Sequence, residues 1–402
     1  MWRRFVMKKS LKILVSLVLV AAIGLVCLSG CLLFRNIELE RDIDMYEKIS
    51  LIKQYLDYYA IYDFDEETAE DSALKYYLLG LKDDAYAYYF NEEEMEEFNS
   101  STKGSFIGVG VNVVKQSDIL EKGLFLYRVL GNSPAEEQGL KAGDIITSVN
   151  GISLVGMSYD DAVDMMLDVE GTVAELTVDR DGESLSFSVT RKSFVQRYVD
   201  YEIIDEIGFI RIHGFSEAAK PQFSEALKDL KNAGVKGLLF DLRNNPGGEL
   251  NTVTDMLDML VPKGEPIIII EYKQEEEITK AKKDPVIEGL PMAVLVNGGS
   301  ASASELFSSC LRDILSVPLV GETTYGKGIG QTTFSLGDGS GLKFTTFRYF
   351  TKSRTDYNGV GLVPDFEVKS TEQQLYGFYV VDHKDDPQMQ KALQVLSDAI
   401  NK

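Results

Sequence analysis

A serine and a lysine that lie 25 residues apart are the side chains of this sequence best suited to nucleophilic catalysis. Ser302 directly precedes a stretch with the apolar spacing of a buried helix face, and it forms an S-x-x-E capping pattern with Glu305. This pattern predicts a helix that begins just after Ser302. The positive end of the helix dipole and the unpaired N–H groups would stabilise an alkoxide or an oxyanion at that position.

Lys327 is the candidate base, because it lies alone between two glycines in a loop bounded by apolar segments. A serine hydroxyl needs a base to remove its proton. A lysine can act as that base near neutral pH if burial lowers its pKa from ~10.4 by roughly three units. Gln331 could orient the amine without adding a charge. The two histidines, His213 and His383, lie in no pattern typical of a Ser-His-Asp triad.

The segments that must position this pair alternate between strand and helix from about Ser193 onward. The predicted strands are IGFIRIHGF, KGLLFDLR, EPIIIIEY and PMAVLVNG, and the predicted helices are FSEALKDLKNAG and LNTVTDMLDMLV. This alternation predicts an α/β layer with a largely buried sheet. The Ser302 loop leaves the carboxyl end of the last of these strands, where active-site loops of such sheets are expected. Two later strands, TTFSL and LKFTTFRYF, are predicted to return to the sheet, and MQKALQVLSDAI to form a C-terminal helix.

The segment DLRNNPGG ends one predicted strand and opens a helix, which makes it the candidate for an oxyanion hole. The N–H groups of Gly247 and Gly248 are the candidates for one half of the hole, and the N–H of Ala303 for the other. Two backbone donors aimed at a developing negative charge can supply several kcal/mol of stabilisation.

Together these motifs resemble the carboxyl-terminal processing, or tail-specific, proteases, which use a Ser-Lys dyad. The resemblance rests on NGGSASASE, YGKG and the glutamine four residues after the lysine. It extends, in family order, over LKYYLLGLKDDAYAYYFNEEEMEEF, IGVGVNV, SPAEEQGLKAGDIITSVNG, DLRNNPGG and GVGLVPD. The resemblance implies that Ser302 is the nucleophile, Lys327 the general base and Gln331 the supporting residue, and that no metal or organic cofactor is needed.

Residues 105–192 resemble a PDZ domain, with five strand-like segments and the sequence SPAEEQGLKAGDIITSVNG. A PDZ domain adds a C-terminal peptide as an extra strand between a strand edge and a helix, while backbone N–H groups bind the peptide carboxylate. The residues of the carboxylate-binding loop would be Gly108, Val109, Gly110 and Val111. The groove would be lined by Val111, Val113, Ala162, Val163 and Met166. This apolar lining predicts a preference for tails that end in hydrophobic residues.

The first 35 residues predict a membrane segment. Five basic residues lie within the first twelve, and an uncharged run of 22 residues follows from Ile13 to Phe34, long enough for a bilayer that needs ~20. Because basic clusters tend to stay on the cytoplasmic side, the rest of the chain is expected outside the cytoplasm. A signal anchor is the favoured interpretation. The alternative is a lipoprotein signal in which Cys31, in the sequence LSGC, carries the lipid; it also places the protein on the outer side of the membrane.

Composition limits the remaining possibilities. A formal net charge of −22 over 402 residues argues against nucleic-acid binding, because such binding depends on basic side chains. Three cysteines, Cys27, Cys31 and Cys310, provide neither a disulfide framework nor a metal-ligand spacing. Residues 36–104 are acidic, rich in tyrosine and helical in period. In the family that the sequence resembles, such a region can form homodimers.

The sequence therefore predicts an α/β protein of the multi-domain α+β kind. Its expected parts are a signal anchor or lipoprotein signal (1–35), a helical region (36–104), a PDZ domain (105–192) and a Ser-Lys protease core with a C-terminal helix (193–402). The expected function is that of a membrane-tethered, extracytoplasmic serine endopeptidase that recognises protein C-terminal tails and cuts the chain upstream. Two alternatives stay open: a catalytically silent PDZ adaptor, and a hydrolase that uses His213 as its base.

Overall fold

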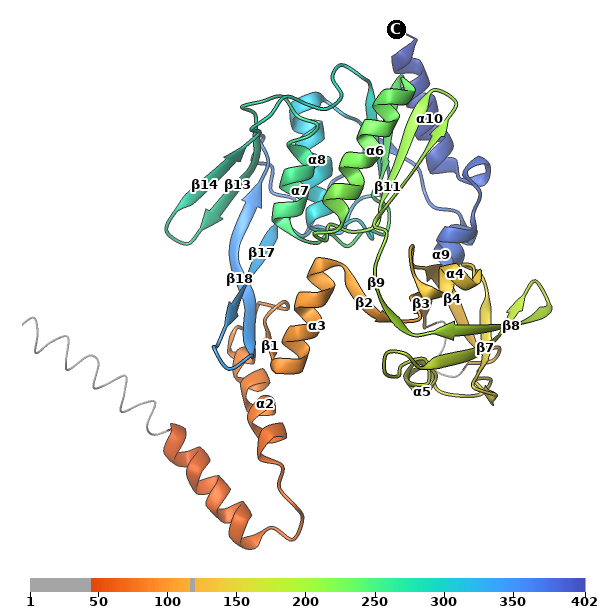
Figure 1. Ribbon diagram of the computed structural model, residues 1–402. Helices are drawn as coiled ribbons and strands as arrows, with labels where there is room; N and C mark the ends of the chain where they lie inside the picture. The colour runs from red at the N-terminus through yellow and green to blue at the C-terminus, as the bar shows by residue number, and fades with distance from the viewer. Residues whose placement is uncertain (1–44, 116–119, 402) are drawn as a thin grey trace, which may run out of the picture. The chain divides into compact units, whose positions relative to one another are not determined.

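The structure is a computed structural model that describes residues 45–115 and 120–401 (Figure 1). The predicted membrane segment from Ile13 to Phe34, with Cys27 and Cys31, lies outside the described residues. The chain divides into two units, one that ends at Tyr76 and one that begins at Tyr77. The first unit contains a helix over residues 45–59 and all but the last residue of α2 (Glu66–Tyr77). Within the described residues, no helix combines the length and the apolarity that crossing a membrane requires.

The second unit begins with a segment in which the prediction of helices is only partly correct. A short 3-10 helix, η1 (Leu78–Gly80), is followed by β1 (Tyr88–Phe90) and by α3 (Glu92–Lys103). Asn91 caps α3 through a capping box with Glu94. The strand β1 was not predicted. It pairs antiparallel with the distant β18 (Gly341–Phe350), and a three-residue strand is defined by such a partner rather than by a local period.

Residues 105–195 form the predicted antiparallel module. Its main sheet has the order β3-β4-β5-β7-β8, with β6 paired to β5, and two short helices, α4 (Pro134–Gln138) and α5 (Tyr159–Asp164), accompany it. The strands are β3 (Val111–Val114), β4 (Leu124–Val129), β5 (Ile145–Val149), β6 (Ile152–Ser153), β7 (Val173–Arg180) and β8 (Glu183–Thr190). A separate pair joins β2 (Ser105–Gly108) to β9 (Lys192–Val195). The stretch FIGVGVNVV therefore contains parts of two strands separated by a bend.

The core of the second unit is the predicted α/β layer. Its sheet has the order β10-β11-β12-β15-β16-β19, parallel except for the edge strand β10. The strands are β10 (Val199–Ile204), β11 (Ile207–Ile212), β12 (Gly237–Asp241), β15 (Met292–Val296), β16 (Leu319–Gly321) and β19 (Phe366–Glu367). Both β12 and β15 are buried along their whole length, which explains their apolar sequences, GLLF before Asp241 in β12 and MAVLV in β15.

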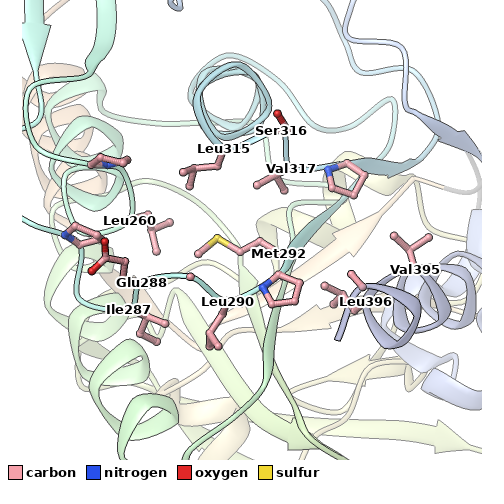
Figure 2. A pocket seen from close by; sticks show the side chains of 16 residues that line it. Leu260, Ile287, Glu288, Leu290, Met292, Leu315, Ser316, Val317, Val395 and Leu396 are labelled. Atoms are coloured by element: carbon pink, nitrogen blue, oxygen red, sulfur yellow. The ribbon is translucent and has the colours of Figure 1, made fainter. Parts of the chain in front are cut away.

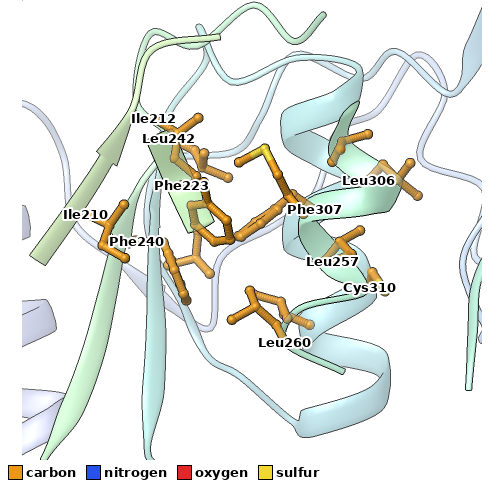
Figure 3. Close-up of a cluster of buried hydrophobic side chains, with 14 of the residues drawn as sticks. Ile210, Ile212, Phe223, Phe240, Leu242, Leu257, Leu260, Leu306, Phe307 and Cys310 are labelled. Atoms are coloured by element: carbon orange, nitrogen blue, oxygen red, sulfur yellow. The ribbon is translucent and has the colours of Figure 1, made fainter. Parts of the chain in front are cut away.

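Helices cover both faces of this sheet. On one face, α6 (Ala219–Ala233), α7 (Leu250–Leu257) and α8 (Ala303–Leu315) pack over Phe240 and its neighbours (Figures 1 and 3). Phe307 of α8 lies with its ring centroid 5.3 Å from that of Phe240 and 6.2 Å from that of Phe223 on α6. On the other face, the predicted C-terminal helix, α10 (Pro387–Ile400), packs through Met389 and Leu396. Truncating a buried Phe of this kind typically costs roughly 3–5 kcal/mol, so α8 is held firmly at the end of β15.

A second sheet corrects one prediction. The segments EPIIIIEY, TTFSL and LKFTTFRYF do not join the parallel sheet. They lie in β13 (Pro266–Tyr272), β17 (Ile329–Ser335) and β18, which form a separate sheet with β14 (Glu276–Lys280) and β1. An apolar run predicts that a strand exists but not which strand it pairs with. The remaining elements are α9 (Glu372–Gly377), η2 (Phe378–Val380) and η3 (His383–Asp385).

Candidate active site

Ser302 lies at the sharp turn between β15 and α8, where the sequence predicts the start of a helix. Its backbone angles are φ 54° and ψ −113°, a conformation that a residue with a side chain rarely adopts. Such a conformation costs on the order of 1–3 kcal/mol and persists only where the surrounding structure enforces it, most often at functional sites. A strained strand-to-helix turn is also the device that presents a nucleophilic serine at the top of an α/β sheet.

The hydroxyl groups of the neighbouring Ser300 and Ser304 donate hydrogen bonds to backbone carbonyl oxygens, and the hydroxyl group of Ser302 makes no such bond among the described residues. The Ser300 hydroxyl donates to the carbonyl oxygen of Leu242 at 2.7 Å, and the Ser304 hydroxyl donates to the carbonyl oxygen of Asn245 at 2.9 Å. Both side chains are fully buried, while Ser302 is half-buried. These bonds fasten the nucleophile loop to the DLRNNPGG segment and leave Ser302 as the accessible hydroxyl among the three.

Glu305 holds the nucleophile turn and the lysine loop together. Its buried carboxylate accepts the Ser302 N–H at 2.9 Å and the Lys327 N–H at 2.8 Å. It also accepts the Gly326 N–H at 2.7 Å and the Thr324 hydroxyl at 2.5 Å. Sequence reasoning identified Glu305 only as a capping residue. No local pattern shows that the same carboxylate reaches a loop about twenty residues further on.

Tyr349 of β18 is a second link that the sequence did not indicate. Its hydroxyl donates to the carbonyl oxygen of Lys327 at 2.6 Å, and the hydroxyl oxygen lies 3.5 Å from Oγ of Ser302. Burial raises the pKa of this phenol, so Tyr349 remains a hydrogen-bond donor throughout the neutral range.

Lys327 lies in an environment that lowers the pKa of its amine. Its side chain is half-buried, and burial, assisted by the positive charge of Lys343, lowers the pKa of its amine, while the nearby Asp84 opposes that shift. The Nζ atom lies 3.9 Å from the centroid of the Tyr86 ring. Within residues 45–115 and 120–401, no hydrogen bond joins Nζ of Lys327 to Oγ of Ser302. The structure thus brings the two loops together and leaves the two reactive atoms unbonded.

Gln331 lies in β17, the strand that follows the lysine loop, but it bonds to a different side chain than expected. Its Nε2 donates to Oγ1 of Thr345 at 2.9 Å, and Oγ1 of Thr345 donates to the Asp84 carboxylate at 2.9 Å. The predicted contact with the Lys327 amine is not among the hydrogen bonds of the described residues. Gln331 is connected to the lysine indirectly, through the segment that contains Asp84.

Of the three N–H groups predicted to form the oxyanion hole, one is already hydrogen-bonded within the protein and two are not. The Gly247 N–H donates to Oδ1 of Asn245 at 2.9 Å, whereas the N–H groups of Gly248 and Ala303 have no hydrogen-bond acceptor among the described residues. Gly247 approaches the nucleophile turn so closely that a Cβ atom there would lie 2.9 Å from Cβ of Ser302 and 2.7 Å from the Ala301 carbonyl oxygen. Gly247 therefore has a packing role, and the free donors are those of Gly248 and Ala303.

The imidazole of His213 is paired with Asp200 and not with Ser302. Its Nε2 lies 2.6 Å from Oδ2 of Asp200, and no hydrogen bond joins it to Ser302 in the described part of the chain. Burial, with the positive charges of Arg128 and Arg211, lowers the pKa of His213 to about 4, although Asp200 opposes the shift. The hydrogen-bond partner of His213 is therefore a carboxylate, and this arrangement does not support the hydrolase in which His213 is the base.

The predicted peptide groove lies in the antiparallel module. Residues 108–111 form the bend between β2 and β3, in which the carbonyl oxygens of Val109 and Gly110 accept N–H groups from residues 135 and 130. The N–H groups of Val109 and Gly110 have no acceptor among the described residues. Ala162 and Met166 are both buried in the domain core. The edge strand β3 is partly occupied, because the Tyr159 hydroxyl donates to the Val113 carbonyl oxygen at 3.3 Å.

A pocket of about 510 Å³ is lined by neither Ser302 nor Lys327 (Figure 2). It is lined by Met292 at the start of β15, by Leu396 of α10 and by other mainly apolar side chains, with Glu288 as its one charged group. Ser302 follows the opposite end of β15. The pocket brings together no nucleophile and base, and the described residues contain no group of three acidic, histidine or cysteine side chains placed to hold a metal ion.

Comparison with known protein families gives two matches. The model of peptidase family S41 matches residues 206–368, which include the Ser302 turn, the Lys327 loop and the DLRNNPGG segment. The PDZ domain model matches residues 98–179.

Single proteins that are similar to this chain include serine proteases. A "Probable CtpA-like serine protease" of Staphylococcus haemolyticus is 31% identical over 79% of this chain and 64% of its own length. The protein of the same name from Staphylococcus saprophyticus is 30% identical over 82% of this chain and 67% of its own length. The chain therefore spans about two thirds of these relatives, and slightly less of the first. Among solved structures, the photosystem II D1 C-terminal processing protease is 27% identical, with a TM-score of 0.51 over 80% of this chain and 86% of that one.

Proposed function

The chain belongs to the carboxyl-terminal processing serine proteases of peptidase family S41, and we propose that it is an endopeptidase that binds protein C-terminal tails and cleaves by a Ser-Lys dyad. The observation that carries the proposal is the backbone of Ser302, held at φ 54° and ψ −113° by a carboxylate that also holds the Lys327 loop. A strained serine at a helix N-terminus, joined to a half-buried lysine, favours acyl transfer over any role that needs no chemistry.

The proposed reaction uses the residues in these roles. The neutral amine of Lys327 takes the proton of the Ser302 hydroxyl, and Oγ forms a bond to the scissile carbonyl carbon. The resulting oxyanion accepts hydrogen bonds from the N–H groups of Gly248 and Ala303, and removing one such donor typically costs about 10²–10³ in rate. The Lys327 ammonium returns its proton to the leaving amine as the peptide C–N bond breaks. Water, deprotonated in turn by Lys327, then hydrolyses the acyl ester and restores Ser302.

Substrate selection is assigned to the PDZ domain. A tail would add as a strand at the free edge of β3, with its carboxylate at the N–H groups of Val109 and Gly110. The Tyr159 hydroxyl would have to leave the Val113 carbonyl oxygen to admit that strand. The partly buried apolar side chains of Val111, Val113 and Val163 support a preference for hydrophobic tails, whereas Ala162 and Met166 lie in the domain core.

The place of action follows from the N-terminal sequence. The basic residues and the 22-residue apolar run support a tether in the membrane, with the catalytic part on the extracytoplasmic side. The tether is a signal anchor or a lipid on Cys31. We also infer that the helical region before the PDZ domain mediates homodimerisation, as the family resemblance implies.

The test is cleavage of an unfolded protein that ends in a hydrophobic tail, by the full chain and three variants. Ser302→Ala and Lys327→Ala should each abolish cleavage while tail binding is retained, and His213→Gln should cleave at close to the wild-type rate. If Lys327→Ala cleaves and His213→Gln does not, the histidine-dependent mechanism is correct instead. If the wild type binds the tail and cuts nothing, the proposed dyad chemistry is wrong for the isolated protein.

A further inference from the structure

The segment before the PDZ domain contributes an aromatic ring to the environment of the catalytic lysine. Nζ of Lys327 lies 3.9 Å from the centroid of the Tyr86 ring, within the distance at which an ammonium group is attracted to the face of an aromatic ring. Tyr86 is half-buried, so the contact is partly shielded from water. The attraction acts on the ammonium form and much less on the neutral amine, because it depends on the positive charge.

Asp84 fixes the position of that ring. Its carboxylate accepts the Thr345 N–H at 2.7 Å and the Thr345 hydroxyl at 2.9 Å, which fastens the segment to β18. Oδ1 of Asp84 also accepts the Tyr86 N–H at 3.0 Å. Four residues after Asp84, β1 pairs in register with β18, with Tyr88 opposite Lys343. The ring is therefore held by a side-chain anchor and by a strand, and not by Lys327 alone.

Charged and titratable groups face Lys327 from several elements. Asp84, in the segment before β1, favours its ammonium form, whereas Lys343 of β18 and burial disfavour it. The buried Glu305 of α8 binds the Lys327 backbone N–H, and Tyr349 of β18 binds its carbonyl oxygen. The phenol of Tyr325 interacts with that of Tyr86. Among these groups, Tyr86 is the one whose ring face meets the amine.

We propose that Tyr86, held by Asp84, is a positioning residue for the catalytic base: its ring binds the ammonium form of Lys327 and keeps the side chain at the Ser302 turn. This inference rests on the Ser-Lys function proposed above. Lys327 becomes an ammonium when it takes the proton of the Ser302 hydroxyl, so the ring stabilises the form that the base step produces. Burial lowers the pKa of the free amine, and the ring offsets part of the cost of charging it.

The inference predicts a change in the pH dependence of catalysis. Tyr86→Leu removes the ring, so it should lower kcat by roughly tenfold. It should also move the acid limb of the kcat/KM profile to lower pH, because the ammonium form loses a stabilising contact and the pKa of Lys327 falls. Tyr86→Phe retains the ring and should restore the wild-type acid limb. A residue needed only for folding would not move the limb in this direction.

The experiment measures cleavage of an unfolded protein with a hydrophobic tail, by the full chain, across the pH range of its acid limb. Tyr88→Leu is the matched control, since Tyr88 lies in the same segment and its ring packs on Phe90. Asp84→Asn is a second variant, which removes the charge that favours the ammonium form and should shift the limb in the same direction. Tail binding in each variant reports whether the protein is folded.

The variants distinguish a failure of the proposed Ser-Lys function from a failure of the role proposed for Tyr86. If Lys327→Ala still cleaves, the dyad itself is wrong. If Lys327→Ala is inactive while Tyr86→Leu and Asp84→Asn keep the wild-type acid limb, the dyad stands and the role of Tyr86 is refuted. A loss of activity that is equal in Tyr86→Leu and Tyr86→Phe, with no shift of the limb, would also refute it.

Discussion

At the level of single residues, Glu305 links the two members of the proposed dyad. Its buried carboxylate accepts the backbone N–H groups of both Ser302 and Lys327, and thus fixes the relative position of the two loops. The carboxylate belongs to the first turn of α8, next to the Ser302 turn. The backbones of the two proposed catalytic residues are held by one shared acceptor, and no hydrogen bond among the described residues joins their side chains.

Glu305→Gln tests this arrangement. The amide group replaces one acceptor oxygen by a donor that faces backbone N–H groups, and each buried group left without a partner costs about 1–3 kcal/mol. We expect the apparent melting temperature to fall and kcat to drop by ~10²-fold, because small displacements of reacting groups have effects of that size. Glu322→Gln is the control, since Glu322 also accepts two hydrogen bonds, from Ser370, but outside the site. Equal effects in both variants would show that Glu305 has only a general structural role.

At the scale of elements, the PDZ domain contacts the segment that forms the proposed oxyanion hole. Nδ2 of Asn244 donates to the hydroxyl oxygen of Tyr127, which lies on β4 of the PDZ domain, at 3.0 Å. Asn244 in turn exchanges two hydrogen bonds of 2.9 Å with Asn297, at the end of the strand that precedes Ser302. A strand of the peptide-binding domain thus reaches the catalytic loops through two asparagine side chains.

Tyr127→Phe removes that contact and keeps the ring, which packs edge-on against Tyr379 with centroids 5.3 Å apart. We expect kcat to fall by a factor of about 5–10, the value of one hydrogen bond of ~1 kcal/mol or slightly more. The affinity of the PDZ domain for a tail peptide should not change. Tyr201→Phe, which removes a hydrogen bond to Asp229 away from the site, should leave kcat unchanged. A Tyr127→Phe variant with wild-type kcat would mean that this contact does not couple the domain to the site.

At the scale of the whole molecule, stability depends on ionisable groups buried between elements. Arg243, in the DLRNNPGG segment, is fully buried and bonds to Asp241 and to Asp386, which caps α10. These contacts fasten the C-terminal helix to the catalytic end of the sheet. The buried His213 at the end of β11 forms a second pair with Asp200, whose carboxylate is partly exposed. Breaking such pairs is costly, because the remaining charge is left without a partner.

The His213 pair predicts how stability depends on pH. The folded-state pKa of His213 is lowered to about 4, whereas an unperturbed histidine titrates near 6.5. Between these values the unfolded chain binds a proton that the folded chain does not, so stability falls as the pH is lowered from 6.5 toward 4. The expected loss is about 3 kcal/mol for a shift of this size. Denaturation of His213→Gln between pH 4.5 and 7 should show a shallower slope than the wild type. A slope equal to that of the wild type would assign the acid sensitivity to other groups.

Much of the fold follows from local patterns. The apolar spacing after Ser302 predicted α8, and the apolar runs GLLF and MAVLV predicted the buried parallel strands. These predictions hold because helix period and complete burial leave a direct record in the sequence. The pairing of β13, β17 and β18 into a second sheet, and the strand β1, could not be predicted in the same way. Pairing partners are chosen by contacts between segments far apart in the chain.

The active site likewise has features that local patterns predict and features that depend on contacts between distant segments. The residue types and their order can be read directly along the chain: a serine at a helix start, a lysine between two glycines, and a glycine-rich turn at a strand end. The packing of the elements adds that Glu305 binds both loops, that the Gly247 N–H is already occupied, and that Tyr86 lies over the amine of Lys327. The reason is physical. Residue type and local period are properties of adjacent residues, whereas hydrogen-bond partners and burial are set by which elements pack together.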